Sequence, residues 1–186
     1  NYSEGLYTEC LLGKKAGEDY VIGTRRGIRN DAPVQGQFGV QNPGSGDMYP
    51  KGGNMLHTIR HIIDNDEQWR GILRGLNSTF WHQTVSGKQV QDFISSKAGI
   101  DLAHVFAQYL TTTKIPVLEY RLAGTSLSYR WNNVVNGFAM PVSITTADST
   151  YTMVKPTTEW QTLAVKLSSP AAFAVNRNFY VTSKLV

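Results

Sequence analysis

The stretch 101-DLAHVFAQYLTTTKIPVLEYRL-122 changes from helical to strand patterning within a few residues. Its first apolar residues recur every three or four positions, which is the spacing of one helix face; they are Leu102, Val105, Phe106, Tyr109 and Leu110. The run 111-TTTKIP-116 then ends the helix, because the residue before a proline avoids the helical conformation. From Leu118 onward apolar and polar residues alternate, as in a half-buried strand. The sequence therefore predicts an α+β chain, with a helical subdomain at 1–113 and a β domain at 114–186.

Upstream of this stretch the sequence predicts several helices. Residues 3–12 form one that Gly13 ends, and residues 15–29 form a second that internal glycines weaken. A helix starts at Tyr49-Pro50, since proline suits the first helical position. Two more helices follow, one with an apolar face from Trp69 to Phe80 and one that starts with Ser86 and Gln89 as a capping box. Residues 31–48 hold two prolines and four glycines and form a long loop.

Downstream, short alternating segments predict a small antiparallel, Ig-like β-sandwich. The apolar residues of these segments are Leu118, Tyr120 and Leu122; Leu127, Tyr129 and Trp131; Phe138, Met140, Val142 and Ile144; and Leu163, Val165 and Leu167. Residues 178–185 form a last strand. Asn132-Asn133 and Asn136-Gly137 are typical turn residues. Pro141 within a strand indicates an edge position.

Composition narrows the function classes. The 41% of hydrophobic residues and 17% of charged residues are an ordinary globular balance. The net charge of +4 is spread over the chain, so we expect no nucleic-acid partner. No apolar run reaches the ~18 residues of a membrane-spanning segment. The single cysteine, Cys10, follows Tyr2 and Leu6 at helical spacing, which predicts a buried structural thiol.

The four histidines do not predict an active site. His57 and His61 lie one helical turn apart, but zinc peptidases place a glutamate directly after the first histidine, and Thr58 stands there. We therefore expect this pair on a polar or domain-facing surface and predict no metal site. His82 and His104 have no evident partners. The sequence also contains no G-x-S-x-G turn and no phosphate-binding G-x-x-x-x-G-K.

Tyr49 ends the glycine-rich loop and starts a helix with an apolar face. A phenol in that place can project into a cleft and donate a hydrogen bond to a developing oxyanion. Most tyrosines, however, are packing or surface residues. Position alone therefore makes Tyr49 a candidate without assigning it a role.

Several ordered segments carry a family resemblance. They are Y-P-K-G-G-N-M-L-H-T-I-R at 49–60, D-F at 92–93 with G-I-D-L at 99–102 and Phe106, I-P-V-L-E-Y at 115–120, F-A-M-P-V at 138–142, and N-Y-S-E-G at 1–5. Together they resemble the aminopeptidase N family of zinc metallopeptidases, the gluzincin aminopeptidases, over essentially the whole chain. Pro50 departs from the family's usual Y-E-K-G, and the change suits a helix start.

The resemblance implies the C-terminal part of a thermolysin-like catalytic domain and the β-sandwich that follows it. In the family, zinc is held by H-E-x-x-H and a downstream glutamate, and a glutamate in a G-x-M-E-N segment binds the free amino terminus of the substrate. Neither H-E-x-x-H nor G-x-M-E-N occurs in this sequence. By this resemblance Tyr49 stabilises the oxyanion, and Glu4 supports the zinc ligands from outside. We expect the parent enzyme to use zinc and peptide substrates, and this chain to need the missing N-terminal domains. Alone, it is expected to hold no zinc and to cleave nothing.

A second class of function stays open. The chain could be a non-enzymatic module whose helices and β-sandwich bind another protein. An H-E-x-x-H within about 30 residues upstream of Asn1 favours the peptidase, and a start codon near Asn1 favours the module. The sequence does not indicate which substrate side chains the parent enzyme prefers, in which compartment the protein lies, or its oligomeric state.

Overall fold

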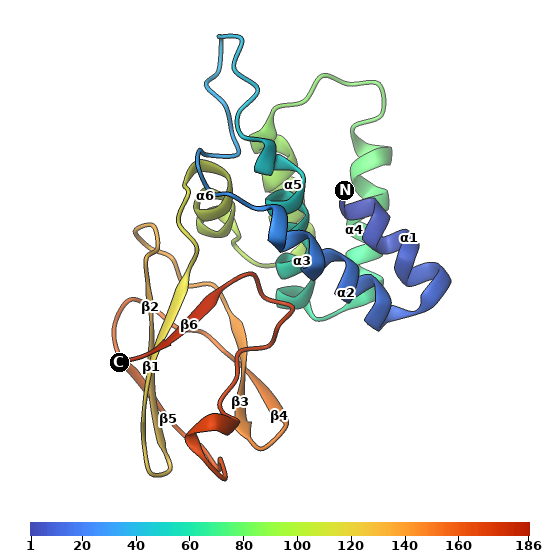
Figure 1. Ribbon diagram of the computed structural model, residues 1–186. Helices are drawn as coiled ribbons and strands as arrows, with labels where there is room; N and C mark the ends of the chain where they lie inside the picture. Colours follow the sequence, from blue (N-terminus) through green and yellow to red (C-terminus); the bar gives the residue numbers. More distant parts are fainter.

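The computed structural model describes residues 1–186 and separates them into a helical part and a β part (Figure 1). The helices are α1 (Tyr2–Leu12), α2 (Lys14–Gly23), α3 (Pro50–Ile63), α4 (Asp66–Thr79), α5 (Gly87–Ala98) and α6 (Ala103–Thr111). The strands are β1 (Val117–Ala123), β2 (Ser126–Asn132), β3 (Val142–Ala147), β4 (Thr150–Val154), β5 (Gln161–Ala164) and β6 (Thr182–Leu185). Short 3-10 turns lie at Thr24–Gly27, Gly46–Met48 and Pro170–Ala172. The predicted α+β class is confirmed.

The helix boundaries follow local chemistry. Gly13 takes a positive φ of 90° between α1 and α2, which a residue with a side chain adopts poorly. Ser86 and Gln89 form the predicted capping box, in which each side chain accepts a hydrogen bond from the other residue's backbone N–H. The predicted second helix is shorter than expected, because α2 ends at Gly23 and a 3-10 turn follows.

The β part consists of two sheets. Four strands lie in the order β5-β2-β1-β6, and β3 pairs with β4. Strands β1 and β2 are antiparallel, with Leu118 opposite Trp131. Strand β6 runs parallel to β1, an exception to the predicted antiparallel pairing. The predicted strand at 138–144 begins only at Val142, so Pro141 precedes β3, and β4 was not predicted at all.

One continuous apolar core joins the helices to the sheets. Gln108 of α6, with no exposed surface, lies at the junction. Its side-chain amide donates to the carbonyls of Lys114 and Asn133 at 3.0 and 3.2 Å, and its oxygen accepts from the Val135 N–H at 2.8 Å. Helix gives way to strand between Thr111 and Val117, but that 1–113 and 114–186 are separate domains stays a prediction.

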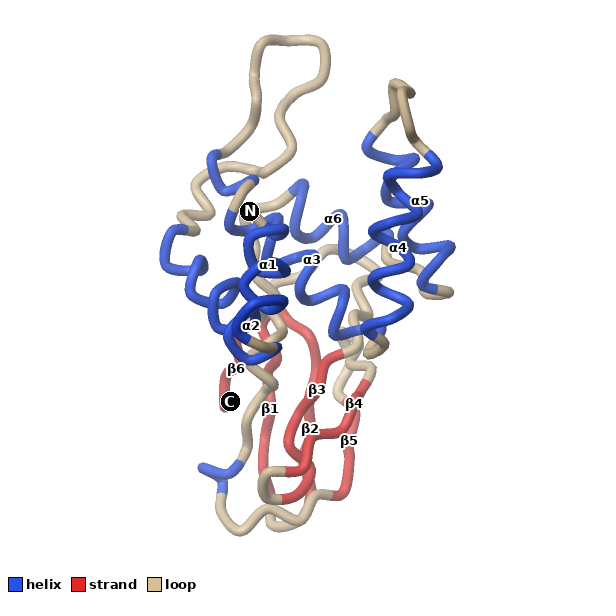
Figure 2. The backbone as a smooth tube through the Cα atoms, turned by 90° about the vertical axis from the view of Figure 1, so that its right-hand side faces the viewer, coloured by secondary structure: helices blue, strands red, loops and turns tan.

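Two loops project from the helical part on the side away from the sheets (Figures 1 and 2). One connects the turn at Thr24–Gly27 to α3, and the other connects α4 to α5. Phe38 in the first is 100% exposed and Trp81 in the second is 70% exposed. Neither side chain contributes to the core. No helix is long and apolar enough to cross a bilayer.

Candidate functional site

Tyr49 lies at the N-cap of α3 and is 62% exposed. Its backbone N–H donates to the carbonyl of Gly46 at 3.4 Å, and its carbonyl accepts from the N–H of Gly53 at 3.0 Å. In the block from Tyr49 to Arg60, Tyr49 is the only residue whose side chain is exposed. The backbone therefore fixes where this residue lies, while the phenol stays free for an outside partner.

The other polar side chains of this block are buried in bonds that hold the fold. Lys51 is 1% exposed, donates to the carbonyl of Thr112 at 2.7 Å, and has a pKa lowered by burial. Asn54, fully buried, donates to the carbonyls of Val21 and Pro50 at 3.1 and 2.9 Å. These bonds join α3 to α2 and to the end of α6. The side chains serve packing, which leaves Tyr49 as the residue available for chemistry.

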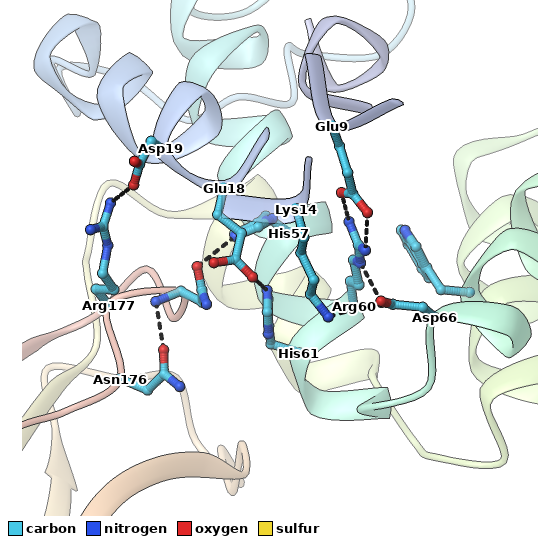
Figure 3. A network of polar contacts seen from close by, with 12 residues as sticks. Glu9, Lys14, Glu18, Asp19, His57, Arg60, His61, Asp66, Asn176 and Arg177 are labelled. Atoms are coloured by element: carbon cyan, nitrogen blue, oxygen red, sulfur yellow. Dashed lines mark hydrogen bonds and ion pairs between the residues drawn. The ribbon is translucent and has the colours of Figure 1, made fainter. Parts of the chain in front are cut away.

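Arg60 at the end of the block forms ionic contacts with two carboxylates, Glu9 and Asp66 (Figure 3). Its guanidinium donates two bonds to Glu9, at 2.6 and 2.8 Å, and one to Asp66 at 2.7 Å. The side chain is 6% exposed. The bonds to Glu9 raise the pKa of Arg60, and the bond from Arg60 lowers that of Asp66. Arg60 thus ties α1 to α3 and α4.

Glu4 lies on the exposed side of α1. Its carboxylate accepts a hydrogen bond from the Tyr20 hydroxyl at 2.8 Å. The start of α1 lies beside the start of α3, since a methyl group on Gly53 would stand 3.8 Å from the Tyr2 nitrogen. Gly53 is one turn after Tyr49, so Glu4 and Tyr49 lie on neighbouring helix ends. The support of zinc ligands by Glu4 stays a prediction.

His57 and His61 face the β part, where His57 contacts Asn178 and the His61 ring lies beside Phe179, so the pair does not lie on an exposed polar surface (Figure 3). A ring nitrogen of His57 lies 3.0 Å from the side-chain oxygen of Asn178. The Nε2 atom of His61 is buried without a hydrogen bond, because Glu18 is 3.8 Å away. Burial lowers the pKa of His57 to about 4 and of His61 to about 3. The neutral forms suit this interface.

That this chain holds no zinc by itself stays a prediction. No group of three or more histidine, cysteine, aspartate or glutamate side chains could hold a metal ion. The His57 nitrogen that would serve as a ligand already contacts Asn178. His82 and His104 lie apart from His57 and His61. The His104 ring packs against Gly137, so closely that a methyl group on Gly137 would clash with it.

A cavity of about 410 Å³ lies between α1, α3 and α4, and Tyr49 does not line it. Its polar lining includes Arg60 together with Glu9 and Asp66, which both accept hydrogen bonds from the Arg60 guanidinium. Cys10 opens onto this cavity and is exposed, so the predicted buried thiol is wrong. The helical spacing of Tyr2, Leu6 and Cys10 was correct, but only the first side chain on that face is buried.

Sequence reasoning missed Asp47, two residues before Tyr49. This carboxylate is 1% exposed and accepts from the backbone N–H groups of Arg29 and Asn30. The available signal was the spacing Ser45-x-Asp47 directly before a helix, where short polar side chains often bond to nearby backbone. No local sequence pattern, however, indicated that the partners of Asp47 are the backbone N–H groups of Arg29 and Asn30, at the other end of the loop.

Comparison with known proteins gives a fold but no family. No family model matches the sequence, and no curated protein matches it. The crystal structure of Legionella pneumophila aminopeptidase A in complex with aspartic acid is similar, with a TM-score of 0.62 and 16% sequence identity. The likeness covers 97% of this chain but 23% of that one. The two share a fold over essentially all of this chain, which spans less than a quarter of the other's length.

Proposed function

We propose that the chain is the C-terminal part of the catalytic domain of a zinc aminopeptidase, together with the following β-sandwich. The observation that carries the proposal is the likeness to an aminopeptidase over 97% of the chain, with Tyr49 as the exposed residue of its helix start. In this role the Tyr49 phenol donates a hydrogen bond to the oxyanion that forms on the scissile carbonyl. A single donor of this kind contributes roughly 10²–10³ in turnover.

The proposal places zinc with residues outside this chain and assigns the chain only the phenol and its scaffold. A neighbouring domain would cover the apolar side chains that α1 exposes, because exposed apolar residues that lie together often meet a partner. On α1 these are Tyr7, Leu11 and Leu12, which are 67%, 61% and 73% exposed. In the proposed enzyme the preceding domains of the same polypeptide cover this face, and peptides are the substrates.

The test compares the full polypeptide with the chain of 186 residues. The full polypeptide should release 4-nitroaniline from aminoacyl 4-nitroanilides, lose that activity to a chelator and regain it with zinc. The chain alone should release none. An inactive full polypeptide would refute the aminopeptidase, while zinc-dependent release by the chain alone would refute the proposed division of the site.

The exposed face of α1 equally favours the second candidate, a non-enzymatic module that binds another protein. The reading frame separates the two. An H-E-x-x-H upstream of Asn1 supports the peptidase, and its absence leaves Tyr49 without a reaction to assist. Tyr7→Ser/Leu11→Ser should then abolish binding of that other protein.

A further inference from the structure

Asp47 is a carboxylate that the fold buries almost completely. Its Oδ1 accepts from the N–H of Arg29 at 3.0 Å, and its Oδ2 accepts from the N–H of Asn30 at 2.6 Å. A buried charge is costly unless such bonds compensate it, and bonds to a charged acceptor are the strong ones. Asp47 therefore holds the two ends of the long loop together across 17 and 18 residues of sequence.

Ser45 closes the same loop base. Its hydroxyl accepts from the Asp47 N–H at 3.1 Å and donates to the Asp31 carboxylate at 3.2 Å. Its backbone N–H donates to the carbonyl of Pro33 at 3.2 Å. Asn30, whose amide Asp47 holds, has a left-handed φ of 52°. Such a conformation persists where surrounding bonds determine it.

The chain leads from this closed base directly into Tyr49. The 3-10 turn at Gly46–Met48 includes Asp47, and the Tyr49 N–H bonds back onto the Gly46 carbonyl. On the other side Lys51 fixes the first turn of α3 to the carbonyl of Thr112. The phenol itself is bonded to nothing, so the backbone on these two sides decides where it points.

We propose that Asp47 is a positioning residue, whose grip on the Arg29 and Asn30 amides sets the direction in which Tyr49 presents its phenol. This inference rests on the proposed function of Tyr49. A catalytic group must be held in place closely, because a displacement of about 1 Å can cost roughly 100-fold in rate.

The test is made in the full polypeptide with Asp47→Asn. This change keeps the size and shape of the side chain, but it replaces one of the two acceptor oxygens with an NH₂ group, which cannot accept from the backbone N–H that faces it. Turnover should fall by about 10-fold or more while KM stays within about 2-fold, since the loss affects the transition state. Asp64→Asn is the matched control at the other end of α3, because Asp64 is exposed and takes no part in the loop base, and it should change turnover by less than about 2-fold.

A double-mutant cycle separates positioning from general damage. If Asp47 acts through Tyr49, Asp47→Asn should cost less than about 2-fold once Tyr49→Phe is present. Losses that simply multiply would overturn the proposal. The proposal would also be overturned if Tyr49→Phe lowered turnover while Asp47→Asn left turnover unchanged. A Tyr49→Phe enzyme with full turnover would instead refute the proposed function itself.

Amide hydrogen exchange in the chain of 186 residues gives a readout independent of activity. Asp47→Asn should lose protection at Arg29 and Asn30 while the Gly53 amide in α3 keeps it. Unchanged protection at the two loop amides would overturn the proposal. If Asp47→Asn fails to fold, Ser45→Ala probes the same base and should lower turnover by about 2- to 5-fold; unchanged turnover would count against the proposal.

Discussion

At the scale of single residues, the block Tyr49–Arg60 contains one exposed phenol among buried polar side chains. Lys51 and Asn54 find their partners at Thr112, Val21 and Pro50. Except for Pro50, these partners are far away in the sequence, so no local pattern indicated the burial. The same limit explains Cys10, whose helical spacing suggested a core position that the fold leaves exposed.

Arg60→Met should destabilise the chain by about 2–4 kcal/mol, because it leaves Glu9 and Asp66 without their shared cation. Arg70→Met is the matched control, since Arg70 and its partner Glu67 are 59% and 77% exposed. An exposed pair of this kind contributes less than about 1 kcal/mol. Urea unfolding followed by circular dichroism measures both. Equal losses in the two variants would contradict the structural role of Arg60.

At the scale of elements, periodicity predicted the helices and most strands, and turn chemistry predicted their ends. Strand β4 was missed although polar and apolar residues alternate from Thr150 to Met153. All but its last residue are exposed, so the apolar side chains of β4 form no buried stripe. The segment before Val142 was predicted as strand because Phe138, Met140 and Val142 alternate with other residues, and the structure does bury Phe138 and Met140. These residues pack without pairing, and the Met140 carbonyl instead accepts from the Trp131 indole at 3.0 Å.

Gln108 joins α6 to the residues around β2, and Gln108→Leu should cost about 2–3 kcal/mol. The change leaves two carbonyls and the Val135 N–H without their partner, and buried groups without partners are costly. Gln83→Leu is the control, because Gln83 is exposed and bonds only within its own turn. Thermal unfolding should show a clear decrease in stability for Gln108→Leu and none for Gln83→Leu. A decrease below about 0.5 kcal/mol would place Gln108 among ordinary surface residues.

At the scale of the whole molecule, residues 176–180 attach the β part to the helices. The Tyr180 N–H donates to the Thr58 hydroxyl at 3.0 Å, and its carbonyl accepts from the Tyr109 hydroxyl at 2.6 Å. Arg177 pairs with Asp19 of α2 (Figure 3). His57 and His61 lie within this attachment, where Arg25, Arg60 and Lys14 also disfavour their charged forms.

The attachment should weaken in acid. An unfolded histidine titrates near 6.5, whereas burial holds the pKa of His57 at about 4. Between these values the unfolded chain binds a proton that the folded chain excludes, so stability is full above pH 6.5 and falls as the pH decreases. From pH 7.5 to 5 the loss should reach about 2 kcal/mol for each histidine of the pair.

Urea unfolding at the two pH values measures this dependence. His57→Gln should reduce the difference between them by about 2 kcal/mol, because glutamine binds no proton in either state. The exposed His82→Gln is the control and should behave as the original chain does. A His57→Gln variant with the full pH dependence would show that His57 does not contribute to acid sensitivity.

We propose that Tyr49 is the catalytic phenol of an aminopeptidase, and Tyr49→Phe in the full polypeptide tests this proposal most directly. Tyr151→Phe is the matched control, because Tyr151 is 46% exposed on β4, away from both Tyr49 and the apolar side chains of α1. Steady-state hydrolysis of an aminoacyl 4-nitroanilide should show kcat reduced by about 10²–10³ with KM nearly unchanged for Tyr49→Phe, and neither changed for Tyr151→Phe. A Tyr49→Phe enzyme with the original kcat would contradict the claim.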